Sequence, residues 1–193
     1  MTTSVQPYHH GNLRETLLRA AERMIDADAS RGFSLRELAR EADVSHAAPY
    51  KHFRDRGELV LVLAERWMGE FVAEQSAAVG SGDARQDLLA LGAAYVRYAR
   101  TRPSRFLTIF DPAVARPGNP PTPEFAELVR VHSALLHDTV TAAVRAGVVG
   151  GAGARAGAVA AALWSQAHGL ATLALLGYLP GADAEAVLAA LLH

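Results

Sequence analysis

The sequence predicts an all-α protein, and three observations support this prediction. Half of the 193 residues are hydrophobic, but only 7% are aromatic and β-branched residues are sparse. Alanine, leucine, arginine and glutamate, which are strong helix formers, are abundant. No segment alternates apolar and polar residues over the length of a strand, whereas apolar residues recur at helical spacing. A chain of this length is expected to form one domain, or two small domains that share a core.

The first two helices are expected before residue 43. Apolar residues at helical spacing predict an amphipathic helix over residues 12–28. Ser34 and Glu37 then fit a capping box, in which the serine oxygen accepts the Glu37 N–H and the glutamate accepts the Ser34 N–H. This pair predicts a short second helix that starts at residue 35.

A third short helix is expected after a turn at residues 42–44. Ser45 is a candidate N-cap that opens this helix, which is expected to extend to Phe53. Pro49 lies within its first turn, where the missing N–H is tolerated.

Six further helices are expected in the remainder of the chain, which makes nine in total. Glycine pairs and prolines mark their ends, and five prolines place a loop at residues 111–123. The change from short to longer helices predicts a domain boundary near residues 55–57, which gives domains of residues 1–55 and 56–193. The six helices are expected at residues 56–79, 84–102, 104–110, 125–146, 154–176 and 183–192.

Several functional classes are not expected from this sequence. The absence of cysteine excludes disulfides, thiolate metal sites and cysteine nucleophiles. No nucleophile–base pair, P-loop or dinucleotide fingerprint is present, so we expect no enzyme, no catalytic residues and no cofactor. His132, His137 and Asp138 are not expected to bind a metal, because the two histidines are five residues apart and leave the face that paired helical ligands use.

The sequence is expected to belong to a cytoplasmic protein. Its N-terminus, MTTSVQPYHHGN, lacks the apolar segment of a signal peptide. Residues 156–179 are long enough to span a membrane, but Ser165, Gln166 and His168 interrupt them and no Lys or Arg follows. We therefore expect a buried bundle helix here and no membrane partner.

The formal net charge of −1 argues at first against a nucleic-acid-binding protein. The local distribution reverses that argument, because residues 1–14 and 44–54 contain no acidic residue. Few phosphates are neutralised by such a segment, so we expect weak non-specific binding to DNA.

Residues 34–53 form a predicted helix–turn–helix motif. In such motifs the second helix enters the DNA major groove and its first residues contact base edges, while other polar residues contact phosphate. Pairs of short helices around a polar turn also occur in all-α proteins without DNA function, so the pattern alone leaves both interpretations open. The candidate DNA-binding residues are Ser34, Arg36, Ser45, His46, Ala47, Tyr50, Lys51, His52 and Arg56.

Residues 8–63 resemble the N-terminal domain of the TetR family of transcriptional regulators. The family pattern, Tyr-x-x-Phe followed by a basic residue and Leu, is matched by Tyr50, Phe53, Arg56 and Leu59. Asp43 departs from the pattern because it occupies a turn position often held by glycine, and we expect it to adopt the left-handed conformation. Arg56-Gly57 stands where Lys-Glu is common.

The C-terminal part resembles a TetR subgroup whose late helix carries Trp-x-x-x-His-Gly, here Trp164 to Gly169. The resemblance implies a nine-helix homodimer in which helices one to three bind a palindromic double-stranded DNA operator. Helices four to seven would enclose a pocket for a small hydrophobic effector, and helices eight and nine would pair with those of the partner. The alanine-rich, nearly uncharged sequence of these last two helices independently favours burial against a second chain, with a monomer core as the alternative.

The resemblance predicts a repressor that the effector releases from its operator. An activator of the same fold, a helical ligand-binding protein without DNA function, and an enzyme that uses His132 or His168 as a base remain alternatives. Aromatic residues at helical spacing also serve as ordinary core. The candidate ligand-binding residues are Trp67, Phe71, Tyr95, Phe106, Phe110, His132, Trp164 and His168.

Overall fold

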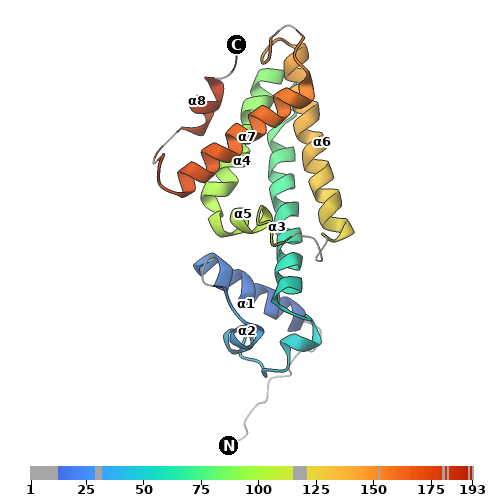
Figure 1. The fold of residues 1–193 in the computed structure, drawn as a ribbon, viewed down its shortest axis with the longest axis vertical. Helices are drawn as coiled ribbons and strands as arrows, with labels where there is room; N and C mark the ends of the chain where they lie inside the picture. Colours follow the sequence, from blue (N-terminus) through green and yellow to red (C-terminus); the bar gives the residue numbers. More distant parts are fainter. Residues whose placement is uncertain are drawn as a thin grey trace, which may run out of the picture. The chain divides into compact units, whose positions relative to one another are not determined.

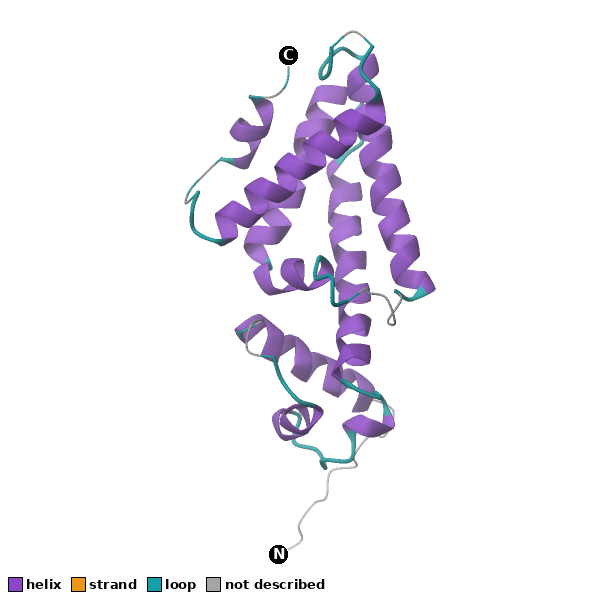
Figure 2. Cartoon of the chain, in the orientation of Figure 1, coloured by secondary structure: helices purple, strands orange, loops and turns teal. Residues whose placement is uncertain are grey.

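A computed structural model describes residues 13–28, 32–114, 121–151, 153–179, 181, 183–190 and 192. In these residues the chain forms eight α-helices and one short 3-10 helix, with no strand (Figure 1, Figure 2). The predicted all-α class is therefore confirmed. Residues 1–12, which make up most of the segment 1–14 that lacks acidic residues, lie outside the described residues.

The chain divides into two compact units, Met1–Leu63 and Ala64–His193. The division falls inside the helix α3 (Arg56–Ala78) rather than before it. The first turns of α3 belong to the smaller unit because Leu59 and Leu63 are fully buried there.

The smaller unit contains α1 (Leu13–Ala27), α2 (Leu35–Glu41), the 3-10 helix η1 (Pro49–Lys51) and the start of α3. Each helix buries an apolar stripe, as its spacing predicts. The fully or nearly fully buried residues include Leu17, Leu18, Ala20, Ala21, Ile25, Leu35, Leu38, Ala39, Phe53, Leu59 and Leu63.

The capping box at the start of α2 is confirmed. The Glu37 N–H donates to Ser34 Oγ at 3.2 Å, and the Ser34 N–H donates to Glu37 Oε2 at 2.8 Å. The turn that follows α2 contains Asp43 with a φ of 52°, which confirms the expected left-handed conformation. An L residue with a side chain is strained in this region, and aspartate tolerates it better than most residues.

The third helix differs from the prediction. Residues 46–48 form a turn and only Pro49–Lys51 are helical, in 3-10 geometry. The N–H groups of Ala48, Lys51 and His52 bond to the carbonyl three residues earlier, because proline has no N–H and its ring opposes a continuous α-helix. The residue that caps η1 is Ala48, with no side-chain hydrogen bond, so Ser45 does not act as the predicted N-cap.

In the larger unit α4 (Ala84–Thr101) is the central helix. It contacts α5 (Pro103–Ile109), α6 (Pro123–Arg145), α7 (Ala156–Leu175) and α8 (Ala184–Ala189), and α6 also contacts α7. One end of this unit is held by an apolar cluster of Leu88, Val140, Ala143, Val149 and Ala160.

The helix α7 is long and apolar enough to cross a membrane by length and composition alone, which is weak evidence for such a role. In the single chain it buries only one stripe, made of Ala160, Ala167, Leu170 and Ala171. Other α7 residues, among them Val159 and Leu163, are half-buried, and the remaining positions are exposed on the single chain, although the sequence predicted a buried helix.

Replacement of Ser34 by alanine is expected to lower the free energy of unfolding by about 1 kcal/mol, because an N-cap hydrogen bond to α2 is lost. Urea denaturation followed by circular dichroism measures the change. Ser45→Ala is the matched control, since the structure gives this serine no capping hydrogen bond. It should change stability by less than about 0.5 kcal/mol. Equal losses in the two variants would contradict the assignment.

Candidate DNA interface and ligand cavity

The nine candidate DNA-binding residues lie on the surface of the smaller unit. Eight are exposed and His52 is half-buried. They come from the start of α2, the turn before η1, η1 itself and the start of α3. Pro49 and Phe53 anchor the segment in the core, and the Arg14 guanidinium lies 5.4 Å from the centre of the Phe53 ring. The buried pair therefore holds the exposed Tyr50 and Lys51 outward.

Lys51 is the only lysine in the sequence. It is exposed, and it forms no ion pair with the part of the chain that the structure describes. Arg56 is exposed as well, but its guanidinium stacks 4.9 Å from the centre of the Phe33 ring. Lys51 is thus the cation of η1 that is free to meet a phosphate.

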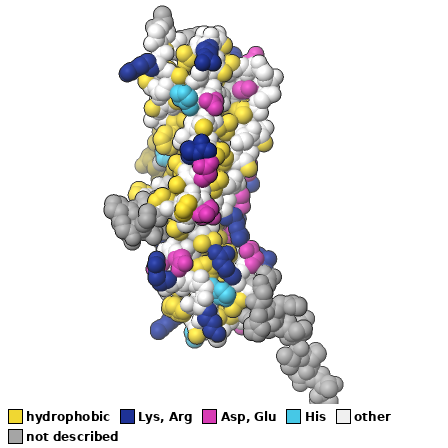
Figure 3. All heavy atoms as spheres, turned by 90° about the vertical axis from the view of Figure 1, so that its right-hand side faces the viewer, with side chains coloured by type: hydrophobic (Ala, Val, Ile, Leu, Met, Phe, Trp, Pro, Cys, Tyr) yellow, Lys and Arg dark blue, Asp and Glu magenta, His cyan; other side chains and the backbone are white. Residues whose placement is uncertain are grey.

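An acidic group neighbours this segment. Asp55 Oδ1 accepts the Glu58 N–H at 2.9 Å, and Asp55 Oδ2 lies 3.3 Å from Arg54 Nε. The hydrogen bond from the Glu58 N–H, and after it the interaction with Arg54, holds the pKa of Asp55 below its ordinary value. On the face drawn in Figure 3, Lys and Arg side chains are interspersed with Asp and Glu side chains.

Seven of the eight candidate ligand-binding residues come together in the larger unit. Tyr95 is at the centre, with ring centroids 5.2 Å from Phe71, 5.5 Å from Phe106 and 6.0 Å from Phe110. His132 and His168 lie 6.4 and 6.2 Å from the Tyr95 ring. Trp164 joins the cluster through both histidines, at 6.4 and 6.5 Å.

A chain of hydrogen bonds crosses this aromatic cluster. Trp164 Nε1 donates to the Tyr95 hydroxyl at 3.3 Å, and that hydroxyl lies 2.7 Å from His168 Nδ1. Burial lowers the pKa of His168 and so favours its neutral form, whose Nδ1 accepts the tyrosine proton in one tautomer and donates to the hydroxyl oxygen in the other. Burial also raises the pKa of Tyr95, which keeps the phenol protonated. The Trp and His of the Trp-x-x-x-His-Gly segment are therefore fixed by one tyrosine on α4.

A cavity of about 40 Å³ lies between α3, α4, α6, α7 and α8. Its wall is mostly leucine, and the described residues that line it include none with a formal charge. Three predicted residues, Tyr95, His132 and Trp164, line the cavity, while Phe71, Phe106, Phe110 and His168 do not. Gln75 also lines it. Sequence reasoning missed Gln75, because one glutamine on a long helix looks like a solvent-exposed residue.

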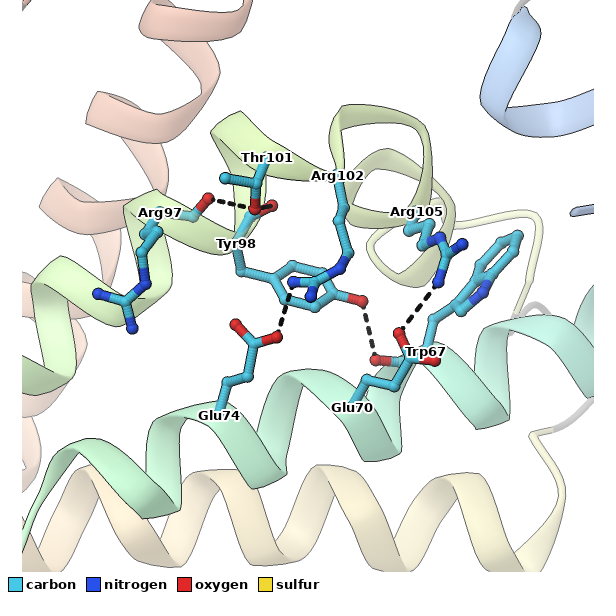
Figure 4. A network of polar contacts seen from close by, with 8 residues as sticks. All are labelled: Trp67, Glu70, Glu74, Arg97, Tyr98, Thr101, Arg102 and Arg105. Carbon is cyan, nitrogen blue, oxygen red and sulfur yellow. Dashed lines mark hydrogen bonds and ion pairs between the residues drawn. The ribbon is translucent and has the colours of Figure 1, made fainter. Parts of the chain in front are cut away.

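Trp67 lies apart from the cavity, in a polar network between α3 and the α4–α5 segment (Figure 4). The Tyr98 hydroxyl donates to the Trp67 carbonyl at 3.1 Å, and the Arg105 guanidinium lies 5.4 Å from the Trp67 ring centre. Two ion pairs run beside this contact, Arg105–Glu70 at 3.1 Å and Arg102–Glu74 at 2.7 Å. The network ties α3 firmly to α4 and α5.

No metal-binding cluster of three or more His, Asp or Glu side chains occurs among the described residues. His132 is buried whereas His137 and Asp138 are exposed, so these residues of α6 face different environments.

An exposed helix–turn–helix segment on one unit, followed by a second, helical unit, indicates the class of DNA-binding transcriptional regulators. Comparison with family models agrees. The model described as bacterial regulatory proteins, tetR family, matches residues 17–63. The model described as tetracyclin repressor-like, C-terminal domain, matches residues 88–193. The chain belongs to the TetR family of bacterial regulatory proteins.

Solved structures show the same fold. A protein of unknown function from Rhodococcus sp. RHA1 is 39% identical, with a TM-score of 0.79 over 96% of this chain and 94% of that one. The TetR family transcriptional regulator PfmR from Thermus thermophilus is 21% identical, with a TM-score of 0.68 and coverage of 90% and 93%. A regulatory protein of the tetR family from Rhodococcus RHA1 is 18% identical, with a TM-score of 0.70 and coverage of 92% for each chain. Comparison with curated proteins found no match.

The stability of the larger unit is expected to fall as the pH drops below about 6.5. Burial lowers the pKa of His132 from its usual 6.5, so the unfolded chain binds a proton that the native side chain resists. The stabilisation that neutral His132 provides is therefore fully present above about pH 6.5. It is lost as the pH falls towards the lowered pKa of the native side chain.

The measurement is urea denaturation at several values between about pH 7 and pH 5, the range in which histidine titrates. His132→Phe should flatten the decline, whereas His137→Phe, at an exposed position of the same helix, should leave it unchanged. Identical pH profiles for wild type and His132→Phe would contradict the prediction.

Proposed function

We propose that this protein is a homodimeric, sequence-specific transcriptional repressor that a small hydrophobic effector releases from a palindromic operator. The observation that carries the proposal is the exposed turn and η1 segment, held outward by buried Pro49 and Phe53, in a chain of the TetR family. On this proposal the protein is not an enzyme and acts in the cytoplasm, where the DNA is.

In the proposed dimer each subunit contributes one smaller unit, called here the DNA head. The DNA contacts proposed for each head are of two kinds. His46 and Ala47 precede η1 on the exposed turn and are proposed to meet base edges, His46 by a hydrogen bond and Ala47 by contact with a thymine methyl. Tyr50, Lys51 and Arg36 are proposed to meet phosphates. Ser34, Ser45, His52 and Arg56 lie around them and are proposed to complete the interface. One head neutralises few phosphates, so specific binding requires two heads held one helical turn apart.

The proposed dimer forms through α7 and α8. Large apolar side chains are exposed on and just after α7, and α8 adds another. Such a concentration of apolar surface is typical of an interaction site. The exposed residues are Trp164, Leu173, Leu176, Tyr178, Leu179 and Val187.

Effector release is proposed to work by a shift between two conformations. The helix α3 contributes to both units, and the network around Trp67 and Tyr98 ties it to α4 and α5 in the larger unit (Figure 4). A ligand that binds best when these helices move would reposition the DNA heads. The ligand must bind the DNA-incompetent state more tightly, and couplings of this kind are typically about 1–3 kcal/mol.

The leucine-lined cavity supports a hydrophobic effector, since such pockets bury apolar ligands. The hydrogen bonds from Tyr95 to Trp164 and His168 support placement in the subgroup with the Trp-x-x-x-His-Gly segment. An activator of the same fold would bind the same DNA and differ only in its effect on transcription. A ligand-binding protein without DNA function would bind no duplex, and an enzyme would lose turnover on replacement of His132 or His168.

The proposal is tested by fluorescence anisotropy with the purified protein and duplex fragments from the region upstream of its own gene. Saturable, salt-sensitive binding to one fragment is expected. If no fragment binds in this way, the protein is not a repressor of that region.

Replacement of Lys51 by alanine is expected to weaken binding to all DNA sequences alike. Each head loses one phosphate contact, so the slope of log K against log salt should become shallower by about one unit per head. Lys51→Arg keeps the charge and serves as the control, with a slope close to wild type. A slope unaltered by Lys51→Ala would show that this residue does not bind phosphate.

A charged residue in the proposed dimer face is expected to dissociate the dimer. Leu173→Glu places a carboxylate at an apolar position of α7 that is 42% exposed in the single chain. Sedimentation equilibrium should then give monomers at concentrations where the wild type is dimeric, because burial of an unpaired charge is unfavourable. Leu107→Glu is the matched control, since Leu107 is 50% exposed on α5, outside the proposed face. Dissociation by both variants, or by neither, would contradict this interface.

A further inference from the structure

Two buried polar side chains of the cavity wall have hydrogen-bonding atoms without partners among the described residues. Gln75 on α3 is 1% exposed and its Nε2 has no partner. His132 on α6 is 6% exposed and neither Nδ1 nor Nε2 has a partner. Both residues line the same cavity. Buried polar groups are normally hydrogen-bonded, so three unpaired atoms at one site point to an external partner.

The other two polar residues of the wall are already paired. The Tyr95 hydroxyl accepts from Trp164 Nε1 and forms a second hydrogen bond with His168 Nδ1, so the hydroxyl and the indole N–H both have partners. Among the described residues of the wall, the polar side chains left with unpaired atoms are therefore Gln75 and His132.

The unpaired atoms define the complementary group. Burial lowers the pKa of His132, so its imidazole is neutral and offers one donor and one acceptor. Gln75 Nε2 adds a second donor. A matching head must accept hydrogen bonds and also donate one. It must also be uncharged, because the described residues that line the cavity include no ion to pair with a buried charge.

We propose that Gln75 and His132 form the polar end of the effector site and select an uncharged, mostly apolar molecule with a hydroxyl or carboxamide head. This inference rests on the proposed function, in which the cavity receives the effector. The leucine residues of the wall contact the apolar body of the molecule, while the paired Tyr95 and Trp164 contribute only their ring surfaces.

The cavity has to enlarge for such a ligand. Its volume of about 40 Å³ is far below the roughly 300–1,000 Å³ of pockets that bind small molecules. Leu188 on α8 and Leu192 just beyond it supply part of the wall. Leu188 Cδ1 is packed so closely on Gly92 that a Cβ atom there would lie 2.6 Å away. Displacement of this six-residue helix would remove Leu188 from the wall and so enlarge the cavity.

The experiment compares three probes with the same apolar body by calorimetry on the full-length protein. 4-Butylphenol has a head that donates and accepts, 4-butylanisole has one that only accepts, and 4-butylbenzoate is charged. The wild type should bind the phenol roughly tenfold more tightly than either of the others, since a hydrogen bond to a buried group contributes about that factor. Absence of saturable phenol binding, or equal affinity for the three probes, would overturn the proposal.

The variants Gln75→Met and His132→Phe keep the side-chain volume but remove the polar atoms. Each should weaken phenol binding by roughly three- to tenfold and reduce the preference for the phenol over the anisole. The free variants should keep or exceed the wild-type Tm at pH 7.5, because no internal hydrogen bond is lost. A clearly lower Tm would assign these groups a structural role and overturn the proposal.

Two controls locate the effect. Thr141→Val removes a buried, unpartnered Oγ1 atom of α6 that lies outside the cavity, and it should leave binding of all probes unchanged. Ala167→Val narrows the cavity itself and should weaken all probes that bind while keeping their order. Loss of the phenol preference in Thr141→Val would contradict the assignment of the two anchors.

Operator DNA separates this inference from the proposed function. If the phenol binds with the expected preference but does not release DNA, the anchors are supported and effector release is wrong. If the phenol releases DNA equally from wild type, Gln75→Met and His132→Phe, effector release stands and the anchors are wrong.

Discussion

The structure of the larger unit depends on the burial of one tyrosine. Tyr95 lies on the central helix α4, and rings from α3, α5, α6 and α7 surround it. Its hydroxyl would be costly to bury alone, but it is paired with Trp164 and His168 of α7. Tyr95 therefore positions the neighbouring helices by packing, and it positions α7 by hydrogen bonding as well. Its ring also forms part of the cavity wall.

Polar groups at the centre of this unit fall into two sets with different consequences. The hydroxyl, indole and imidazole around Tyr95 satisfy one another, which makes them part of the framework. Gln75 and His132 have atoms without such partners among the described residues. Burial of these atoms lowers stability unless a ligand forms hydrogen bonds with them. Proteins commonly retain unfavourable groups of this kind at functional sites, where selection for binding outweighs stability. This contrast, rather than the aromatic content alone, distinguishes the proposed binding surface from ordinary core.

The two units carry different parts of the proposed switch. The smaller unit presents its polar residues on an irregular turn and a 3-10 helix, because Pro49 prevents a regular α-helix there. The larger unit contains the cavity and the exposed apolar face of α7. The helix α3 belongs to both, and the Trp67–Tyr98 contact with its two neighbouring ion pairs fixes its second part to α4 and α5. On the proposed function, these contacts would carry a movement of α4 and α5 to α3.

The sequence by itself determined the helical class, the capping box at Ser34 and the left-handed turn at Asp43, because these follow from local propensity and short-range hydrogen bonds. The sequence also predicted eight ligand-binding residues, and seven of them lie in one cluster in the structure. Only the tertiary structure decided which of them line the cavity, that Trp67 lies apart, and that Gln75 joins the wall. These features depend on which helix faces meet and on which polar atoms remain unpaired, and contacts between distant residues are not encoded in local periodicity.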